Sequence, residues 1–183
     1  MVTVFLAEGF EEIEAVTPID ILKRGGVDVR TCSITSSRLV TGAHQIPFYA
    51  DLTLNELSGE EEAILLPGGM PGTLNLKNCK ELEKRILEHA AKGKILAAIC
   101  AAPTVFGALG LLKDKEATCF PGMEEELFAA KHLESPTVFS GNVLTSRGAG
   151  TAFDFGLHLL SLLKGEEVAR DLARTMCYRE GEN

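Results

Sequence analysis

The chain has 183 residues, of which 45% are hydrophobic and 24% charged, a composition typical of one globular domain. Its formal net charge is −8, and its 18 lysines and arginines are scattered, which argues against nucleic acid as a partner. Five cysteines without a C-x-x-C pair and four histidines without ligand spacing argue against a disulfide framework and a zinc site. We therefore expect one domain over residues 1–183, with no metal site, in the reducing cytoplasm.

Patterns typical of buried strands alternate with helical patterns in the first hundred residues. Apolar runs predict strands at Val2–Leu6, Val27–Ile34, Ala63–Leu66 and Ile95–Ile99. Helical patterns lie between them, at Glu11–Arg24, Pro71–Lys77 and Glu81–Lys92. Pro47 argues against a central strand at Val40–Tyr49, which we interpret as a short hairpin or an edge segment. Strands that are apolar on both faces and separated by helices are typical of a parallel sheet covered on both sides.

The second half of the chain begins with an uncharged segment, Ile95–Leu112, that is long enough for a membrane span. Its proline, glycines and alanines favour a buried strand followed by a helix, so we expect no membrane association. Two short strands, Thr137–Phe139 and Val143–Thr145, are predicted around a Ser-Gly-Asn turn. The helix predicted at Thr151–Leu163 is apolar nearly all round, which indicates full burial or a subunit contact. A last helix is predicted at Glu166–Met176.

One predicted strand ends in a cysteine, Cys100, and small residues lead from it into Pro103. Hydrolases place a nucleophile on such a strand-to-helix elbow, where the residues two before and two after it must be small. Here these neighbours are Ala98 and Ala102. The first free N–H groups of the helix would favour a thiolate and hold an oxyanion. The alternative is a buried structural cysteine, a common environment for a free thiol.

Two other segments follow predicted strands, at the edge of the sheet where ligands bind. Gly68–Gly69 is consistent with an oxyanion or anion site built from backbone N–H groups, and equally with a tight turn. The acidic residues that open the first predicted helix mostly complement its dipole. Glu14 differs, because we expect it beside the buried face of that helix, where burial would raise its pKa and suit it to proton transfer. That face is predicted to include Ile13, Val16 and Leu22.

Four ordered motifs carry a resemblance to a known family, which extends from Met1 to about Lys164. They are Glu11–Glu14 with Pro18–Asp20, Leu66–Gly69, Ala97–Pro103 and Leu144–Thr151. In these motifs the chain resembles the ThiJ/PfpI superfamily, and within it the branch of the human parkinsonism-associated deglycase and bacterial YajL. The resemblance implies an α/β, flavodoxin-like three-layer sandwich with a mostly parallel central sheet, a nucleophile elbow, and a homodimer.

The resemblance also implies roles for individual residues. Cys100 matches the reactive cysteine of the family, and Glu14 matches the carboxylic acid that hydrogen-bonds its sulfur. The backbone N–H groups of Gly69 and Ala101 match the donors near that sulfur. Polar residues close to the site or to the dimer contact are matched by Arg24 and Ser146.

The implied activity is that of a cysteine-dependent, cofactor-independent glyoxalase or deglycase. Its substrates would be methylglyoxal and other small α-oxoaldehydes, or early glycation adducts of proteins and nucleotides. The alternative is an oxidative-stress sensor or chaperone-like protein that uses the oxidisable Cys100. The chain departs from the human branch at Phe120, where that branch has a histidine, and we expect the neighbouring Cys119 to be buried. Ala101 stands where protease-like members carry a histidine, which disfavours a peptidase mechanism.

Overall fold

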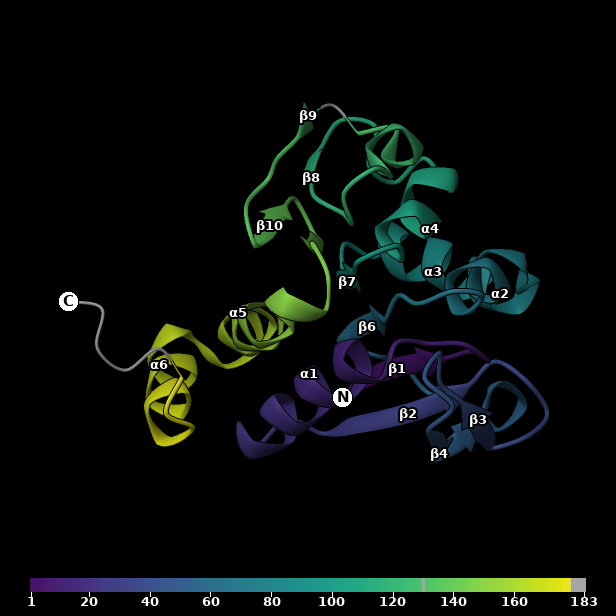
Figure 1. The fold of residues 1–183 in the computed structure, drawn as a ribbon, viewed down its shortest axis with the longest axis horizontal. Helices are drawn as coiled ribbons and strands as arrows, with labels where there is room; N and C mark the ends of the chain where they lie inside the picture. The colour runs from purple at the N-terminus through teal and green to yellow at the C-terminus, as the bar shows by residue number, and fades with distance from the viewer. Residues whose placement is uncertain (130, 179–183) are drawn as a thin grey trace.

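The computed structural model describes residues 1–129 and 131–178. Its centre is a seven-stranded sheet in the order β10-β11-β7-β6-β1-β2-β5, in which only β10 runs antiparallel to its neighbour (Figure 1). The strands are β1 (Val2–Leu6), β2 (Val29–Ser33), β5 (Leu52–Thr53), β6 (Ala63–Leu66), β7 (Ile95–Ile99), β10 (Thr137–Ser140) and β11 (Val143–Ser146). The predicted α/β class with a mostly parallel sheet is confirmed.

Helices cover both faces of this sheet, because successive side chains of each buried strand point to opposite sides. Val4 and Leu6 of β1 pack into one hydrophobic cluster, and Phe5 packs into the other. The first cluster lies under α1 (Glu12–Arg24), α5 (Ala152–Lys164) and α6 (Glu166–Thr175). The second lies under α2 (Gly72–Asn78), α3 (Lys80–Ala91) and α4 (Pro103–Ala108). The result is the three-layer arrangement that the resemblance implied.

Shorter elements lie outside the central sheet. The predicted hairpin at Val40–Tyr49 is confirmed as the antiparallel pair β3 (Leu39–Thr41) and β4 (Pro47–Tyr49). The two-residue strands β8 (Glu116–Ala117) and β9 (Lys131–His132) pair in parallel. In the described part of the chain, 3₁₀ turns form at η1 (Leu54–Glu56), η2 (Glu124–Leu127) and η3 (Ala149–Thr151).

The buried face of α1 differs from the predicted one. Ile13 and Val16 were expected in the core, but they are 53% and 44% exposed. They line an apolar groove of about 290 Å³ that also includes Phe10, Ile46 and Phe48, from the loop after β1 and from the hairpin. The helix is instead buried along a face that contains Glu12, Glu14, Ala15, Pro18, Ile19, Ile21 and Leu22. The prediction was wrong because two carboxylates occupy core-facing positions, where hydrogen-bond donors compensate their burial.

Two other expectations concern the long apolar segments. Ile95–Leu112 forms β7 and α4, as predicted, and no helix in the described ranges is long and apolar enough to cross a membrane. The helix α5 is not buried all round, since Phe153 remains 38% exposed while Phe155 and Leu159 are fully buried.

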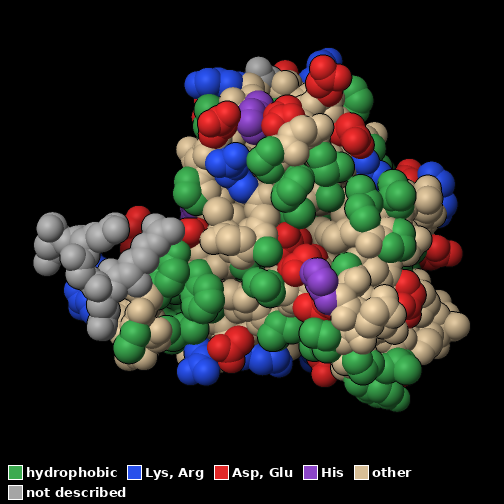
Figure 2. Space-filling view, in the orientation of Figure 1, with side chains coloured by type: hydrophobic (Ala, Val, Ile, Leu, Met, Phe, Trp, Pro, Cys, Tyr) green, Lys and Arg blue, Asp and Glu red, His purple; other side chains and the backbone are tan. Residues whose placement is uncertain are grey.

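Cationic and acidic side chains are interspersed on the face shown in Figure 2, in keeping with the scattered charges of the sequence.

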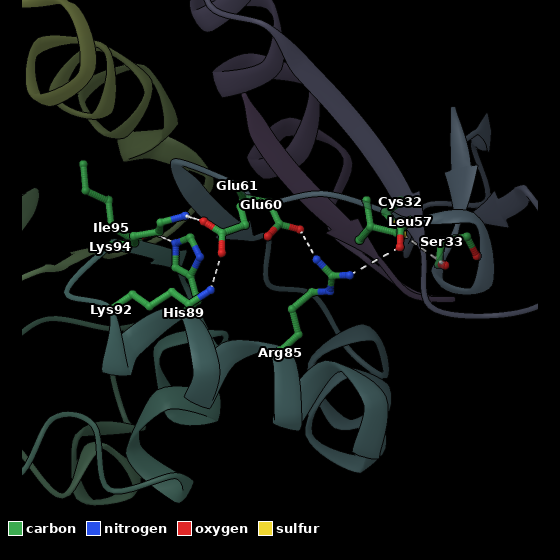
Figure 3. Close-up of polar contacts among 10 residues, drawn as sticks. All are labelled: Cys32, Ser33, Leu57, Glu60, Glu61, Arg85, His89, Lys92, Lys94 and Ile95. Carbon is green, nitrogen blue, oxygen red and sulfur yellow. Dashed lines mark hydrogen bonds and ion pairs between the residues drawn. The ribbon is translucent and has the colours of Figure 1, made fainter.

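A polar network ties α3 to the amino ends of β6 and β7 (Figure 3). Arg85 donates to the buried carboxylate of Glu61 at 2.6 Å, and Lys94 donates to Glu60 at 2.9 Å. His89 lies buried between them with Nε2 3.0 Å from the carbonyl oxygen of Ile95. A cleft of about 400 Å³ borders this network. It lies at the end of the parallel strands opposite to the one at which Cys100 is placed.

Candidate active site

Cys100 occupies the sharp turn between β7 and α4, as predicted. Its φ of +66° lies in the left-handed region that residues with a Cβ rarely adopt. Its backbone N–H donates to the carbonyl oxygen of Ser146 at 2.9 Å, which joins the turn to the end of β11. The small neighbours Ala98 and Ala102 are fully buried, and the cysteine itself is half-buried. This is the geometry of a strand-to-helix elbow that presents its side chain at the carboxyl edge of the sheet.

The two glycines after β6 bring another loop against this elbow. A Cβ on Gly68 would lie 2.7 Å from the Glu14 carboxyl and 2.8 Å from the Cys100 Cβ. Gly69 has a φ of +91°, and a Cβ there would lie 2.5 Å from the backbone nitrogen of Glu11. The pair therefore makes a tight turn, and the absence of side chains also lets the Gly69 N–H reach the Cys100 sulfur. The two interpretations left open by the sequence are thus compatible.

Glu14 is only 1% exposed and points from α1 toward the elbow. Its Oε2 accepts a hydrogen bond from the Gly68 N–H at 2.9 Å. The carboxyl also interacts with the backbone N–H of Ala149 and with the Cys100 thiol. Burial raises the pKa of Glu14 to about 7, and the nearby charge of Glu11 acts in the same direction. Glu14 can therefore gain or lose a proton near neutral pH.

The thiol of Cys100 is also affected by burial. Burial first, and the charge of Glu14 second, raise its pKa to about 12. The backbone N–H groups of Ala101 and Gly69 donate to the sulfur and lower the pKa. The expectation that nearby N–H groups favour the thiolate is correct in direction, but burial beside a carboxylate outweighs them.

These two ionisations are coupled, because Glu14 opposes the thiolate only while it is charged itself. A protonated Glu14 donates a hydrogen bond to the sulfur instead, and such a bond favours the thiolate. With one proton between them, the pair has two arrangements: thiol with carboxylate, and thiolate with carboxylic acid. The second arrangement places a nucleophile and an acid side by side.

Ser146 and Arg24, the two further predicted residues, lie in different places. Ser146 is fully buried at the end of β11, and its backbone carbonyl holds the Cys100 N–H. Arg24 is exposed at the far end of α1, ten residues or about 15 Å along the helix from Glu14. Its guanidinium donates to Asp20 at 2.6 Å. Ser146 thus adjoins the candidate site, while Arg24 does not; a dimer contact of Arg24 stays a prediction.

Phe120 borders the site on another side. Its backbone N–H donates to the Cys100 carbonyl oxygen at 2.8 Å, and its side chain is 50% exposed. A Cβ built on Gly148 would lie 3.5 Å from the Phe120 ring and 3.9 Å from the Glu14 carboxyl. An apolar, half-exposed ring therefore flanks the site. Cys119 is buried, as expected.

Sequence reasoning missed the contribution of the turn at residues 148–151 and of the hairpin. Thr151 was noted only as the end of a motif and the start of a predicted helix, yet its hydroxyl bonds Ser146 and Gly148. On the hairpin, His44 lies 2.8 Å from Glu12 and 3.8 Å from Glu11. These three side chains form one polar cluster, in which a ring nitrogen and carboxylate oxygens lie within 4.8 Å of one another. No spacing rule could reveal this group, because His44 is far from both glutamates in the sequence.

Fold and site together define an α/β protein with a cysteine elbow paired to a buried carboxylic acid. Residues 1–162 match the model of the DJ-1/PfpI family, and the chain belongs to that family. It is 41% identical over 177 residues to protein DJ-1 homolog B of Arabidopsis thaliana, covering 95% of this chain and 40% of that protein. The chain thus spans less than half the length of this relative, and 45% of DJ-1 homolog A from the same plant.

A shorter relative and a solved structure match over nearly their whole length. The chain is 31% identical to a Caenorhabditis elegans protein named glutathione-independent glyoxalase DJR-1.2, covering 93% of this chain and 91% of that protein. The structure of oxidized Toxoplasma gondii DJ-1 superposes with a TM-score of 0.94 at 32% identity. The superposition covers 97% of this chain and 98% of that one.

Proposed function

We propose that this chain is a cysteine-dependent, cofactor-independent glyoxalase that converts small α-oxoaldehydes such as methylglyoxal into hydroxy acids. The observation that carries the proposal is the convergence of four groups. The Cys100 sulfur meets the Glu14 carboxyl and the N–H groups of Gly69 and Ala101. The glyoxalase name of the Caenorhabditis elegans relative supports the same class of substrate. Early glycation adducts of proteins or nucleotides, the substrates of a deglycase, would use the same groups.

The proposed reaction begins with the thiolate form of Cys100 and the acid form of Glu14. The sulfur attacks the aldehyde carbon, and Glu14 protonates the resulting oxyanion to give a hemithioacetal. During the attack, the N–H groups of Gly69 and Ala101 stabilise the developing negative charge. The Glu14 carboxylate then removes the proton from the former aldehyde carbon to give an enediolate, and this proton is returned to the neighbouring carbon. The hydroxyl proton passes from the former aldehyde oxygen to the oxygen on that neighbouring carbon, which leaves a carbonyl next to sulfur. The product is a thioester, which water hydrolyses to lactate and the free thiol.

The test is lactate formation from methylglyoxal by the purified protein, without added thiol or amine. We expect Cys100→Ser and Glu14→Gln each to lower turnover more than ~100-fold, the scale of losing a nucleophile or its proton partner. Cys177→Ser is the matched control, because Cys177 is an exposed cysteine outside the candidate site. Its activity should equal that of the unmodified chain. Full activity in Cys100→Ser would exclude the proposed mechanism.

The same assay separates the two functions. If the unmodified chain forms no lactate, the oxidative-stress sensor becomes the better proposal, with Cys100 oxidised to a sulfinate that Glu14 hydrogen-bonds. The buried Cys32 and Cys119 would then be the internal reference, since peroxide should not reach them. The homodimer remains a prediction of the family resemblance, the cytoplasmic location remains a prediction from the cysteine pattern, and the chaperone-like activity remains the alternative to the enzyme.

A further inference from the structure

Two hydroxyl groups bond each other beneath the turn that faces Glu14. Ser146 Oγ and Thr151 Oγ1 lie 2.7 Å apart. Ser146 Oγ donates to the Pro136 carbonyl oxygen at 2.8 Å, and Thr151 Oγ1 accepts from the Gly148 N–H at 3.1 Å. Thr151 Oγ1 also lies 2.9 Å from the Gly148 carbonyl oxygen. The two side chains thus connect this turn to the loop before β10.

Counting protons gives this chain of hydrogen bonds a direction. Two hydroxyls supply two protons for three contacts. The Gly148 carbonyl is already served by the Thr151 N–H at 2.8 Å, so it does not need the hydroxyl proton. In the arrangement that gives each contact one proton, the Gly148 N–H donates to the Thr151 hydroxyl, and the Thr151 hydroxyl donates to Ser146 Oγ. Ser146 in turn donates to the Pro136 carbonyl oxygen. The Thr151 hydroxyl is the central link, since it accepts from the turn and donates to Ser146.

The turn at residues 148–151 contributes a hydrogen-bond donor, the Ala149 N–H, to the candidate site. The N–H of Ala149 interacts with the Glu14 carboxyl, and this contact favours the charged form of Glu14. Gly148 lies so close that a Cβ on it would be 3.9 Å from Glu14 Oε1. The position of the Ala149 N–H therefore depends on how the turn is closed.

We propose that Thr151 is a positioning residue for Glu14, whose hydroxyl closes the turn at residues 148–151 and holds the Ala149 N–H against the carboxylate. This inference rests on the proposed pairing of Glu14 with Cys100. It assigns Ser146 a part as well, because Ser146 anchors the Thr151 hydroxyl and bonds the Cys100 N–H. Thr151 acts on the balance between the two proton arrangements of the pair without touching the reacting atoms.

Several charged or titratable groups act on Glu14. Cys100 faces it from the end of β7, and Glu11 acts on it from the N-terminus of its own helix. The glycine loop and the turn contribute the backbone N–H groups of Gly68 and Ala149. On the hairpin, His44 is paired with Glu12, and this pairing raises the pKa of His44. Because His44 is a titratable group in contact with Glu11 and Glu12, it is replaced in the experiment by a side chain that does not titrate.

The experiment measures the rate of alkylation of Cys100 by iodoacetamide between pH 5 and 9, with the modified peptide quantified by mass spectrometry. All variants carry His44→Gln. The variant that carries only His44→Gln is the parent. Its alkylation rate should rise with pH to a plateau, and the midpoint of this rise should be the pKa of Glu14. Glu14→Gln provides the reference, because its rate should rise as that of a single thiol, without this plateau.

Thr151→Val removes the hydroxyl and keeps the shape of the side chain. We expect its midpoint to move up by about 0.5–1 pH unit, because the charged form of Glu14 loses a donor. The plateau should rise about 3- to 10-fold, since less of the single proton stays on sulfur when the carboxylate is less favoured. Thr151→Ser keeps the hydroxyl and should reproduce the unshifted profile.

The outcomes separate this inference from the function on which it rests. An unshifted midpoint in Thr151→Val, with a plateau present in the parent, would overturn the role of Thr151 alone. A parent profile identical to that of Glu14→Gln would overturn the Glu14–Cys100 pairing. A shift that Thr151→Ser shares would show a packing effect and count against the hydroxyl. Circular dichroism of each variant confirms that the compared proteins are folded.

Discussion

Cys100 holds its sulfur at the site in a backbone conformation that strains any residue with a Cβ. The left-handed conformation costs such a residue about 1–2 kcal/mol, and Cys100 has a φ of +66°. Cys100→Gly and Cys100→Ala both remove the sulfur, so the difference between their free energies of unfolding reports the cost of the backbone conformation. We expect the glycine variant to be the more stable by about 0.5–1 kcal/mol, after subtraction of the greater flexibility of unfolded glycine.

Urea unfolding of the two variants measures this difference. Equal stability, or a more stable alanine variant, would contradict a strained elbow.

At the scale of single residues, the sequence predicted the roles of Cys100 and Glu14 because each belongs to a local motif. It did not reveal Thr151, whose hydroxyl matters only because the chain folds back on Ser146 and Gly148. Contacts of this kind have no periodic signature.

Among the elements, the loop after β6 has little free space around its glycines. A methyl group on Gly68 would lie 2.7 Å from the Glu14 carboxyl and 3.0 Å from the Ile99 carbonyl oxygen. We expect Gly68→Ala to lower the free energy of unfolding by about 1–3 kcal/mol and to separate Glu14 from Cys100. Gly150→Ala is the control, because a Cβ there meets nothing within 4 Å. It should change stability by less than about 0.5 kcal/mol.

Thermal unfolding and lactate assays of these two glycine variants make the comparison. Comparable losses in both would indicate that loop flexibility, not close contact, is what the glycine at position 68 provides. An active Gly68→Ala variant would show that the loop can move away from Glu14.

The elements differ in how well their sequence predicts them. β1, β6 and β7 begin and end where their apolar runs predict, because a strand buried on both faces leaves a continuous signal. The inward face of α1 was predicted correctly at Leu22 and wrongly at Ile13 and Val16, since the apolar residues of the helix lie on two sides. Ile13 and Val16 face the hairpin groove, while Ile21 and Leu22 face the sheet. Periodicity alone cannot choose between two partly apolar faces of one helix.

For the whole molecule, the buried Glu14 makes stability depend on pH. Its pKa is about 7 in the folded chain and 4.5 in its ordinary state, so the folded chain binds more protons between these values. The contribution of Glu14 to the stability of the folded chain is therefore highest below about pH 4.5, and it is lost as the pH rises through 7. The expected loss is about 3 kcal/mol.

Urea unfolding at pH 5 and pH 8 tests this dependence by comparing the unmodified chain with Glu14→Gln. The difference between the two proteins removes the effects of His89 and His158, whose pKa values are lowered by burial in both. The unmodified chain should lose more stability toward pH 8 than the variant does. Parallel pH profiles would show that Glu14 is already ionised at pH 5 in the folded chain.

The segments around the site are joined to one another by their main chains. Cys100 bonds Ser146 and Phe120 in this way, and Glu11 donates to the Gly68 carbonyl oxygen at 2.9 Å. Replacing a side chain deletes none of these bonds. These main-chain bonds do not depend on which nucleophile or acid the site carries, whereas the turn at residues 148–151 is closed by the Thr151 hydroxyl and the Gly68 N–H is held by the Glu14 carboxyl. The main-chain bonds therefore make the chain a suitable starting point for redesign of the nucleophile at position 100.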